Sequence, residues 1–292
     1  MPQLISVGQV IDQSWDFFTK HFQTLMKISL WSFVISIVWI IGTIFAPIGD
    51  PALSILGGFT AAEGAGIIIM ALASFPIAPI ISVWILVTLM MTVAPLVAGK
   101  KVNAREMFKG GWKMFVPYVW VALLKGLVLL LPALLLVPGI VLIFVNASVE
   151  GGAVLGAISV LLTFAGALAG VVISIMLTIE LNFIGFELIL ENNRGGKALS
   201  ASRALVKGRF WKTFWRLIIP KLVFYFGGFL VQAVLMVLFS VLLATAASMG
   251  DETVLRISNM FAHVISIATV VLVTPIVVLA DYLVFDSLRK NR

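Results

Sequence analysis

Long apolar runs alternate with short polar segments along the whole chain. An α-helix needs about 20 apolar residues to cross a hydrocarbon core about 30 Å thick, and six stretches meet that length. We therefore predict an all-α, polytopic membrane protein in which 1–292 forms a single transmembrane domain. The predicted crossings are 28–46, 77–98, 116–145, 153–190, 217–249 and 257–280.

Prolines modify this pattern in two of the apolar runs. The run 64–98 is too long for one crossing, and we expect Pro76 and Pro79 to divide it and leave 64–75 at the outer surface. In the third crossing, Pro132 and Pro138 should kink or end the helix.

The positive charges cluster in every second polar segment between these apolar runs. Nineteen of the twenty Lys and Arg residues lie in four patches, and only Arg256 lies elsewhere. The patches are the N-terminal region with Lys20 and Lys27, residues 100–125, residues 194–221 and the C-terminal tail. The intervening turns carry Asp50, Glu63, Glu150, Asp251 and Glu252. Because positive residues in short loops stay in the cytoplasm, we predict both termini on the cytoplasmic side of a prokaryotic inner membrane.

Composition supports a membrane protein and narrows its chemistry. Hydrophobic residues make up 61% of the chain and charged residues 11%, with a mean hydropathy of +1.15, whereas soluble domains carry roughly 25% charge. We interpret the net charge of +7 as a cytoplasmic face for anionic lipid headgroups, and we expect no nucleic-acid partner. The chain has no cysteine and only two histidines, His21 and His263, and it lacks the P-loop and Gly-x-Ser-x-Gly motifs. We expect no enzymatic activity, metal or cofactor.

A Trp followed three residues later by Phe occurs three times, each time just before an apolar run. The three Trp residues are 97 and 99 residues apart. Self-similarity at a fixed period indicates repeated structure, so we predict three parallel units, about 1–99, 100–193 and 194–292. Each unit would be an amphipathic helix followed by a transmembrane hairpin. Chance combined with general aromatic anchoring is the alternative. The predicted interfacial anchors are Trp15, Phe18, Trp112, Phe115, Trp211 and Phe214.

The sequence signals for the three predicted amphipathic helices differ in strength. In the first, Ser6 and Gln9 can form a capping box, and in the second Asn103 and Glu106 can do the same. The third has a polar stripe opposite an apolar face but no good N-cap. Such helices lie in the headgroup plane with their basic residues toward phosphate, although they could instead be cytoplasmic extensions of the crossings. The predicted headgroup-facing residues are Arg105, Lys109, Lys113, Arg203, Lys207, Arg209 and Lys212.

Three charged residues fall inside the predicted crossings. Lys125 and Glu180 reach similar depth from the cytoplasmic end at about 1.5 Å per residue, and Glu187 lies two turns from Glu180 on the same face. Charges at such depth are costly, so we expect Lys125 to pair with a carboxylate. These residues would form either a structural ion pair or a polar site that opens to the cytoplasm. Snorkelling of Lys125 to the interface is a further alternative.

The segment after the fourth run carries a recognisable pattern. Its residues are Leu190-Glu191-Asn192, Ala198, Ser202-Arg203-Ala204-Leu205-Val206-Lys207-Gly208 and Trp211. Together with Ser6–Asp12 and Phe285–Arg289, this pattern resembles a bacterial and archaeal membrane family. That family is similar to the membrane domain fused to some glycerophosphoryl diester phosphodiesterases. The resemblance implies six helices. Catalysis in the fused enzymes belongs to a separate soluble barrel, which this chain has no polar segment long enough to form.

These observations lead to one expected function and one alternative. We expect a non-enzymatic integral membrane protein that contacts lipid headgroups or a protein partner through its basic cytoplasmic face. The alternative is a small permease or lipid-handling transporter with a polar path near Lys125, Glu180 and Glu187. Flux through the protein would favour the transporter, and tight lipid or protein association without flux would favour the contact protein.

Overall fold

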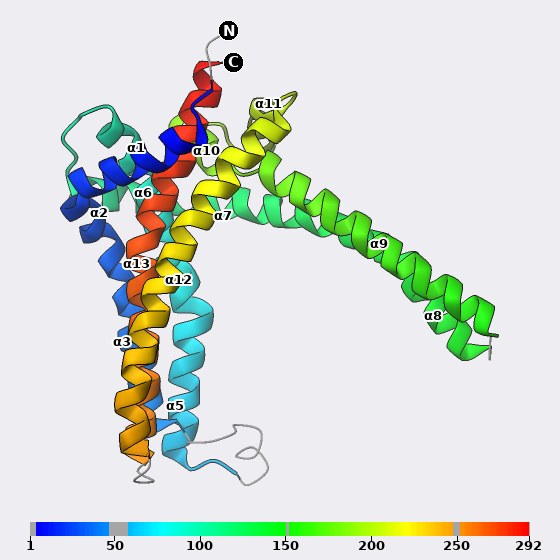
Figure 1. Cartoon of the computed structure of the whole chain (residues 1–292), viewed down its shortest axis with the longest axis horizontal. Coiled ribbons are helices and arrows are strands. Elements are labelled where there is room, and N and C mark those ends of the chain that lie inside the picture. Colours follow the sequence, from blue (N-terminus) through cyan, green and yellow to red (C-terminus); the bar gives the residue numbers. More distant parts are fainter. Residues whose placement is uncertain (1–3, 47–57, 150–151, 248–251, 292) are drawn as a thin grey trace. The chain divides into compact units, whose positions relative to one another are not determined.

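The computed structural model describes residues 4–46, 58–149, 152–247 and 252–291 (Figure 1). All secondary-structure elements among these residues are helices, and none is a strand. Six helices among them are long and apolar enough to cross a membrane, which confirms the all-α class and the predicted number of membrane-length helices. Their bounds are Phe22–Phe45, Ala61–Val97, Ala104–Ser148, Ala153–Leu190, Phe210–Ser240 and Arg256–Lys290.

The chain divides into two compact units. The first comprises Met1–Phe115 and Arg216–Ser287, and the second comprises Val116–Trp215 and Leu288–Arg292. The boundaries fall inside three long helices, α7 (Ala104–Leu130), α12 (Phe210–Ala247) and α13 (Glu252–Lys290). They do not coincide with the predicted repeat boundaries near 99 and 193. The repeat and the single transmembrane domain stay predictions.

The first unit begins with two short helices, α1 (Val7–Lys20) and α2 (Phe22–Ser29), which are separated at His21. The predicted capping box of α1 is present, since Ser6 accepts from the Gln9 backbone N–H and Gln9 accepts from the Ser6 backbone N–H. A 3₁₀ turn at Leu30–Ser32 then leads into α3 (Phe33–Phe45). The first predicted amphipathic helix is therefore a separate element.

The predicted division at Pro76 and Pro79 is wrong. Helix α5 (Ala61–Leu72) continues through a π-helical turn at Ala73–Ile77 into α6 (Ala78–Val97). The wider π turn accommodates the missing N–H of Pro76 without ending the helix, and Pro79 lies in the first turn of α6. Residues 64–75 thus belong to a continuous helical run. This run packs closely on α3, because a side chain at Gly66 would collide with the backbone at Phe45 and Ala46.

Helices α12 and α13 also belong mainly to the first unit and pack along each other. A Cβ at Gly228 of α12 would lie 2.6 Å from a Val273 methyl of α13, so only glycine permits this approach. Arg256, the single basic residue outside the four patches, donates from Nη1 to the carbonyl oxygens of Thr43, Ile44 and Ala46. It thereby caps the C-terminal end of α3, where unpaired carbonyls and the helix dipole favour a cation.

The second unit is built around a helical hairpin. Helix α7 ends at Leu130, a 3₁₀ segment Leu131–Leu136 follows, and α8 (Val137–Ser148) continues the first arm of the hairpin. Helix α9 (Ala153–Glu180) is the returning arm and packs antiparallel to it. The interruption confirms that the prolines in this run would kink or end the helix. Gly166 of α9 lies against the Leu135 carbonyl, where any side chain would clash. Two short helices complete the unit, α10 (Ile184–Leu190) and α11 (Gly196–Val206).

The second predicted amphipathic helix is not a separate element. Residues 104–115 form the first turns of α7, so the alternative of an extension of the crossing holds here. Asn103 accepts from the Arg105 backbone N–H, and its side-chain amide donates to Glu106, so Asn103 does cap the helix. The predicted turn residues Asp50, Glu150 and Asp251 lie outside the described residues.

Candidate functional site

Helix α11 presents a row of polar side chains on one face. Lys197, Ser200, Arg203 and Lys207 are exposed, whereas Ala198, Ser202, Leu205 and Val206 are buried on the opposite side. The division follows the helical period of i, i+3 and i+4, and it confirms the polar stripe expected for the third amphipathic helix. The absence of a side-chain N-cap on this helix is also as predicted.

Ser202 on the buried side of α11 bridges the break between α9 and α10. Its hydroxyl donates to the Glu180 carbonyl oxygen at 2.7 Å and accepts from the Phe183 backbone N–H at 3.2 Å. Both backbone groups lie at the junction of the two helices, where they lack intrahelical partners. One buried hydroxyl therefore fixes the orientation of α11 relative to the end of α9.

The Glu180 side chain pairs with α11 as well. Its Oε2 lies 2.8 Å from Arg203 Nε, and the Arg203 side chain remains 66% exposed. A hollow of about 480 Å³ opens beside this pair and is lined by Glu180, Ser200, Arg203, Ala204 and Lys207. A smaller hollow of about 210 Å³ lies next to it, lined by Ala204, Leu205, Lys207, Arg209 and Leu288. Lys207 contributes to both, so cationic groups dominate this surface.

Glu187 is only 2% exposed and has a structural partner in the next loop. Its Oε2 accepts from Asn193 Nδ2 at 2.6 Å, and its backbone carbonyl accepts from the Asn193 N–H at 3.0 Å. These bonds close the 191–195 loop, in which Asn192 and Gly195 have positive φ. The buried carboxylate thus holds the turn that leads into α11.

The three predicted intramembrane charges all lie in the second unit. Lys125 is half-buried on α7. In the contacts described above, Glu180 pairs with Arg203 and Glu187 accepts a hydrogen bond from Asn193. The sequence indicated neither of these two contacts. The pairing of Lys125 with one of these carboxylates stays a prediction.

The other segments of the sequence pattern also make structural contacts. Arg289 Nε lies 2.9 Å from Glu191 Oε1, and Arg209 Nη2 donates to the Asn291 carbonyl at 2.7 Å. In the first unit, Ser287 Oγ accepts from the Ile5 N–H, and Arg216 donates to the Ile5 carbonyl. Much of the pattern therefore anchors chain segments, and α11 is the part that also offers an exposed charged surface.

In each predicted aromatic anchor the Trp and Phe rings are in contact, but the interplanar angles differ, at 38° for Trp15–Phe18, 24° for Trp112–Phe115 and 68° for Trp211–Phe214. The ring centroids are 6.0 Å apart for Trp15 and Phe18, 5.3 Å for Trp112 and Phe115, and 5.6 Å for Trp211 and Phe214. The Trp side chain of each pair is exposed. Of the predicted basic residues, Arg105, Lys109, Lys113, Arg203, Lys207 and Lys212 are exposed, and Arg209 is half-buried.

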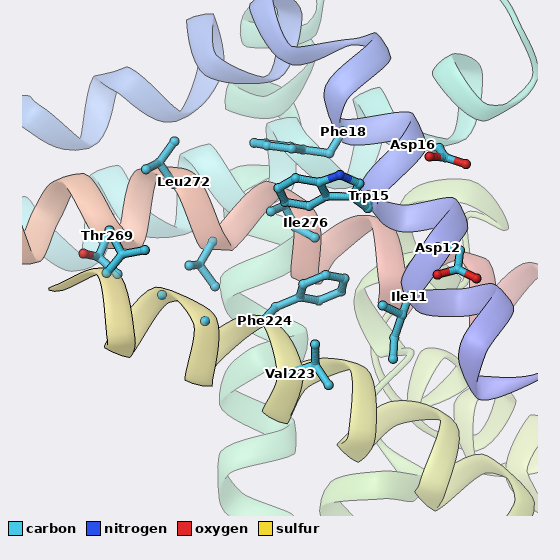
Figure 2. Close-up of a pocket in the computed structure, with 14 residues that line it drawn as sticks. Ile11, Asp12, Trp15, Asp16, Phe18, Val223, Phe224, Thr269, Leu272 and Ile276 are labelled. Carbon is cyan, nitrogen blue, oxygen red and sulfur yellow. The ribbon is translucent and has the colours of Figure 1, made fainter. Parts of the chain in front are cut away.

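Sequence reasoning did not find an apolar cavity in the first unit. It measures about 760 Å³ and lies between α1, α12 and α13, a size within the range of about 300–1,000 Å³ that is common for ligand sites. Figure 2 shows Ile11, Trp15 and Phe18 directed from α1 toward α12 and α13, with Asp12 and Asp16 on the outer side of α1. The signal in the sequence was the apolar face of α1, but nothing indicated which helices it would cover.

An ion pair between two membrane-length helices was also missed. Lys221 Nζ on α12 lies 2.9 Å from Asp281 Oδ1 on α13, and both side chains are less than a quarter exposed. Among the described residues, no group of three or more His, Cys, Asp or Glu side chains is placed to hold a metal ion. Comparison with known proteins gives no match to a family model, a curated protein or a solved structure.

Proposed function

We propose that this chain is a non-enzymatic integral membrane protein of a prokaryotic inner membrane, and that its basic face binds anionic lipid headgroups. The observation that carries the proposal is the exposed polar row of α11, with Arg203 and Lys207 lining a hollow of about 480 Å³. Arg and Lys are the side chains that pair with phosphate oxygens. Membrane-surface basic residues contribute about 1 kcal/mol each toward anionic leaflets.

The anchoring of α11 supports this role. Ser202 and Glu180 fix the helix to the end of α9, so its cations are held in place before a lipid arrives. A preorganised site loses less entropy when the ligand binds. In the proposed topology α11 lies on the cytoplasmic side, with Trp211 and Phe214 in the adjacent interface. A protein partner with an acidic surface is the alternative occupant of this face.

Two further proposals accompany this one. The chain is similar in its short motifs to the membrane domain of glycerophosphoryl diester phosphodiesterases, and we propose membership of that broader group without its catalytic activity. The alternative function, a permease with a path near Lys125, Glu180 and Glu187, is less well supported. The two carboxylates are engaged by Arg203 and Asn193, which favours a structural role for them.

Lipid binding by matched charge variants tests the proposal. Purified protein is depleted of lipid and titrated with phosphatidylglycerol or phosphatidylcholine, and native mass spectrometry counts the bound lipids. We expect Lys197→Gln/Lys207→Gln to weaken phosphatidylglycerol binding about thirtyfold, which corresponds to about 1 kcal/mol for each of two interfacial cations. The control Lys20→Gln/Lys27→Gln removes the same charge from exposed positions on α1 and α2. Equal losses in both variants, or no preference for phosphatidylglycerol in the wild type, would contradict the proposal.

A further inference from the structure

The cavity of the first unit is built as an elongated groove. From α12 it is lined by Val223, Phe224, Gly227, Gly228 and Val231, and from α13 by Thr269, Leu272, Val273 and Ile276. Eight residues separate Val223 from Val231, which corresponds to about 12 Å along a helix. The lining on this side consists of apolar side chains and glycines apart from Thr269. Such a groove fits a linear alkyl chain better than a compact polar ligand.

Gly227 keeps the groove open. A Cβ built at this glycine meets no atom within 4 Å, although the neighbouring Gly228 is in close contact with α13. A mid-helix glycine costs roughly 0.5–1 kcal/mol relative to alanine. Because Gly227 is not needed for helix packing, its small size has a consequence only for the space in the groove.

Helix α1 lines the groove with aromatic side chains and carries two carboxylates at its rim. The Trp15 and Phe18 rings are in contact, and both line the cavity. Asp12 and Asp16 also border it; they are exposed, one helical turn apart, with their carboxylates on the outer side of α1 (Figure 2). Within the described part of the chain, neither carboxylate has a salt-bridge partner. The rim of the groove therefore carries two negative charges on α1, which can attract a cationic group.

These features together select the chemistry of an occupant. The apolar groove takes a hydrocarbon chain, and the rim takes a positively charged group. A primary ammonium has three N–H donors and can bond both carboxylates at once, whereas a quaternary ammonium has none. We propose that the groove between α1, α12 and α13 binds one acyl chain of an ethanolamine phospholipid, with its ammonium group between Asp12 and Asp16. This site is independent of the anionic-lipid face proposed for α11.

Two variants separate the two halves of this site. Gly227→Leu fills the groove, and Asp12→Asn/Asp16→Asn removes the rim charge without removing volume. Gly126→Leu is the matched control for the first variant, since Gly126 is also a helical glycine with nothing within 4 Å but does not line the cavity. Glu106→Gln, an exposed carboxylate on α7, is the control for the second.

Lipid-depleted protein is titrated with phosphatidylethanolamine, phosphatidylcholine and phosphatidylglycerol of identical acyl chains, and bound lipid is counted by native mass spectrometry. The wild type is expected to bind phosphatidylethanolamine about tenfold more tightly than phosphatidylcholine, which corresponds to two charge-assisted hydrogen bonds at an exposed rim. Gly227→Leu should abolish this binding, and the double Asp variant should bind both zwitterionic lipids equally. Phosphatidylglycerol binding should persist in both variants, which separates this site from the α11 face.

Three outcomes would overturn the proposal. The first is equal wild-type affinity for phosphatidylethanolamine and phosphatidylcholine, which would mean that the rim does not distinguish a primary from a quaternary ammonium. The second is unchanged phosphatidylethanolamine binding by Gly227→Leu in a protein that melts like the wild type. The third is a parallel loss in Gly126→Leu, which would show that the effect does not come from the groove.

Discussion

Lys221 and Asp281 form an ion pair at 2.9 Å between α12 and α13, inside two helices of membrane length. In a low-dielectric setting each charge depends on the other, because removing one partner leaves an uncompensated charge. We predict that Lys221→Met lowers stability in detergent by about 3 kcal/mol, and that Lys221→Met/Asp281→Leu recovers most of this loss. Thermal unfolding of the three proteins measures both effects. A double variant no more stable than Lys221→Met would show that the two residues are not coupled.

The cap on α3 leads to a second prediction. Arg256 donates to three carbonyls at the end of this helix, and hydrogen bonds to a charged group contribute about 1.5–3 kcal/mol. Arg256→Met should therefore destabilise the protein by about 2 kcal/mol and speed amide hydrogen exchange near residues 43–46. Arg256→Lys keeps the charge on a shorter side chain that places its donors differently, so we expect an intermediate effect. Unchanged exchange at the end of α3 in Arg256→Met would disprove the capping role.

The buried hydroxyl of Ser202 leads to a third prediction. Ser202→Ala leaves the Phe183 N–H and the Glu180 carbonyl without their partner in a buried setting, which costs about 1–3 kcal/mol. Ser200→Ala, two residues earlier on the exposed face, is the control and should change stability by less than about 0.5 kcal/mol. Melting temperatures of the two variants decide the matter, and equal shifts would count against the bridge.

Membrane topology is tested directly because the chain contains no cysteine. Lys109→Cys and Lys207→Cys place single thiols at exposed positions on α7 and directly after α11. Nineteen of the twenty positive residues lie in patches assigned to the cytoplasm, so we expect both thiols to resist an impermeant maleimide in intact cells and to react after lysis. Labelling of either position from outside would exclude the six-crossing arrangement with cytoplasmic termini.

Local features of the fold were predictable from the sequence, and long-range pairings were not. The apolar lengths predicted six long helices, Ser6 and Gln9 predicted the start of α1, and the 3.6-residue period predicted the exposed row of α11. These features depend on neighbouring residues alone. The ion pair of Glu180 with Arg203 could not be predicted in this way, because depth in a helix does not determine which helices are adjacent. The pairing of Lys125 with Glu180 or Glu187 stays a prediction.

The error at Pro76 has a similar origin. Sequence rules treat a proline inside a helix as a break, but neighbouring structure can supply a π turn that absorbs it, as at Ala73–Ile77. The groove on α12 and α13 could not be predicted from the sequence either. Its apolar residues are of the kind found throughout the crossings, and only the placement of α1 over them creates a cavity.

The hydrogen bond from the Ile5 N–H to Ser287 spans 282 residues of sequence. Ribosomes add about 5–20 residues per second, so Ile5 emerges roughly 15–55 s before its partner. During that interval α1 exists without the segment that anchors its start, and its apolar face has neither α12 nor α13 to cover. The nascent helix would therefore rest on the bilayer surface or on an insertion factor. Assembly of the groove is consequently a late step in the biogenesis of this protein, and conditions that slow translation of the second half should prolong the exposure of Trp15 and Phe18.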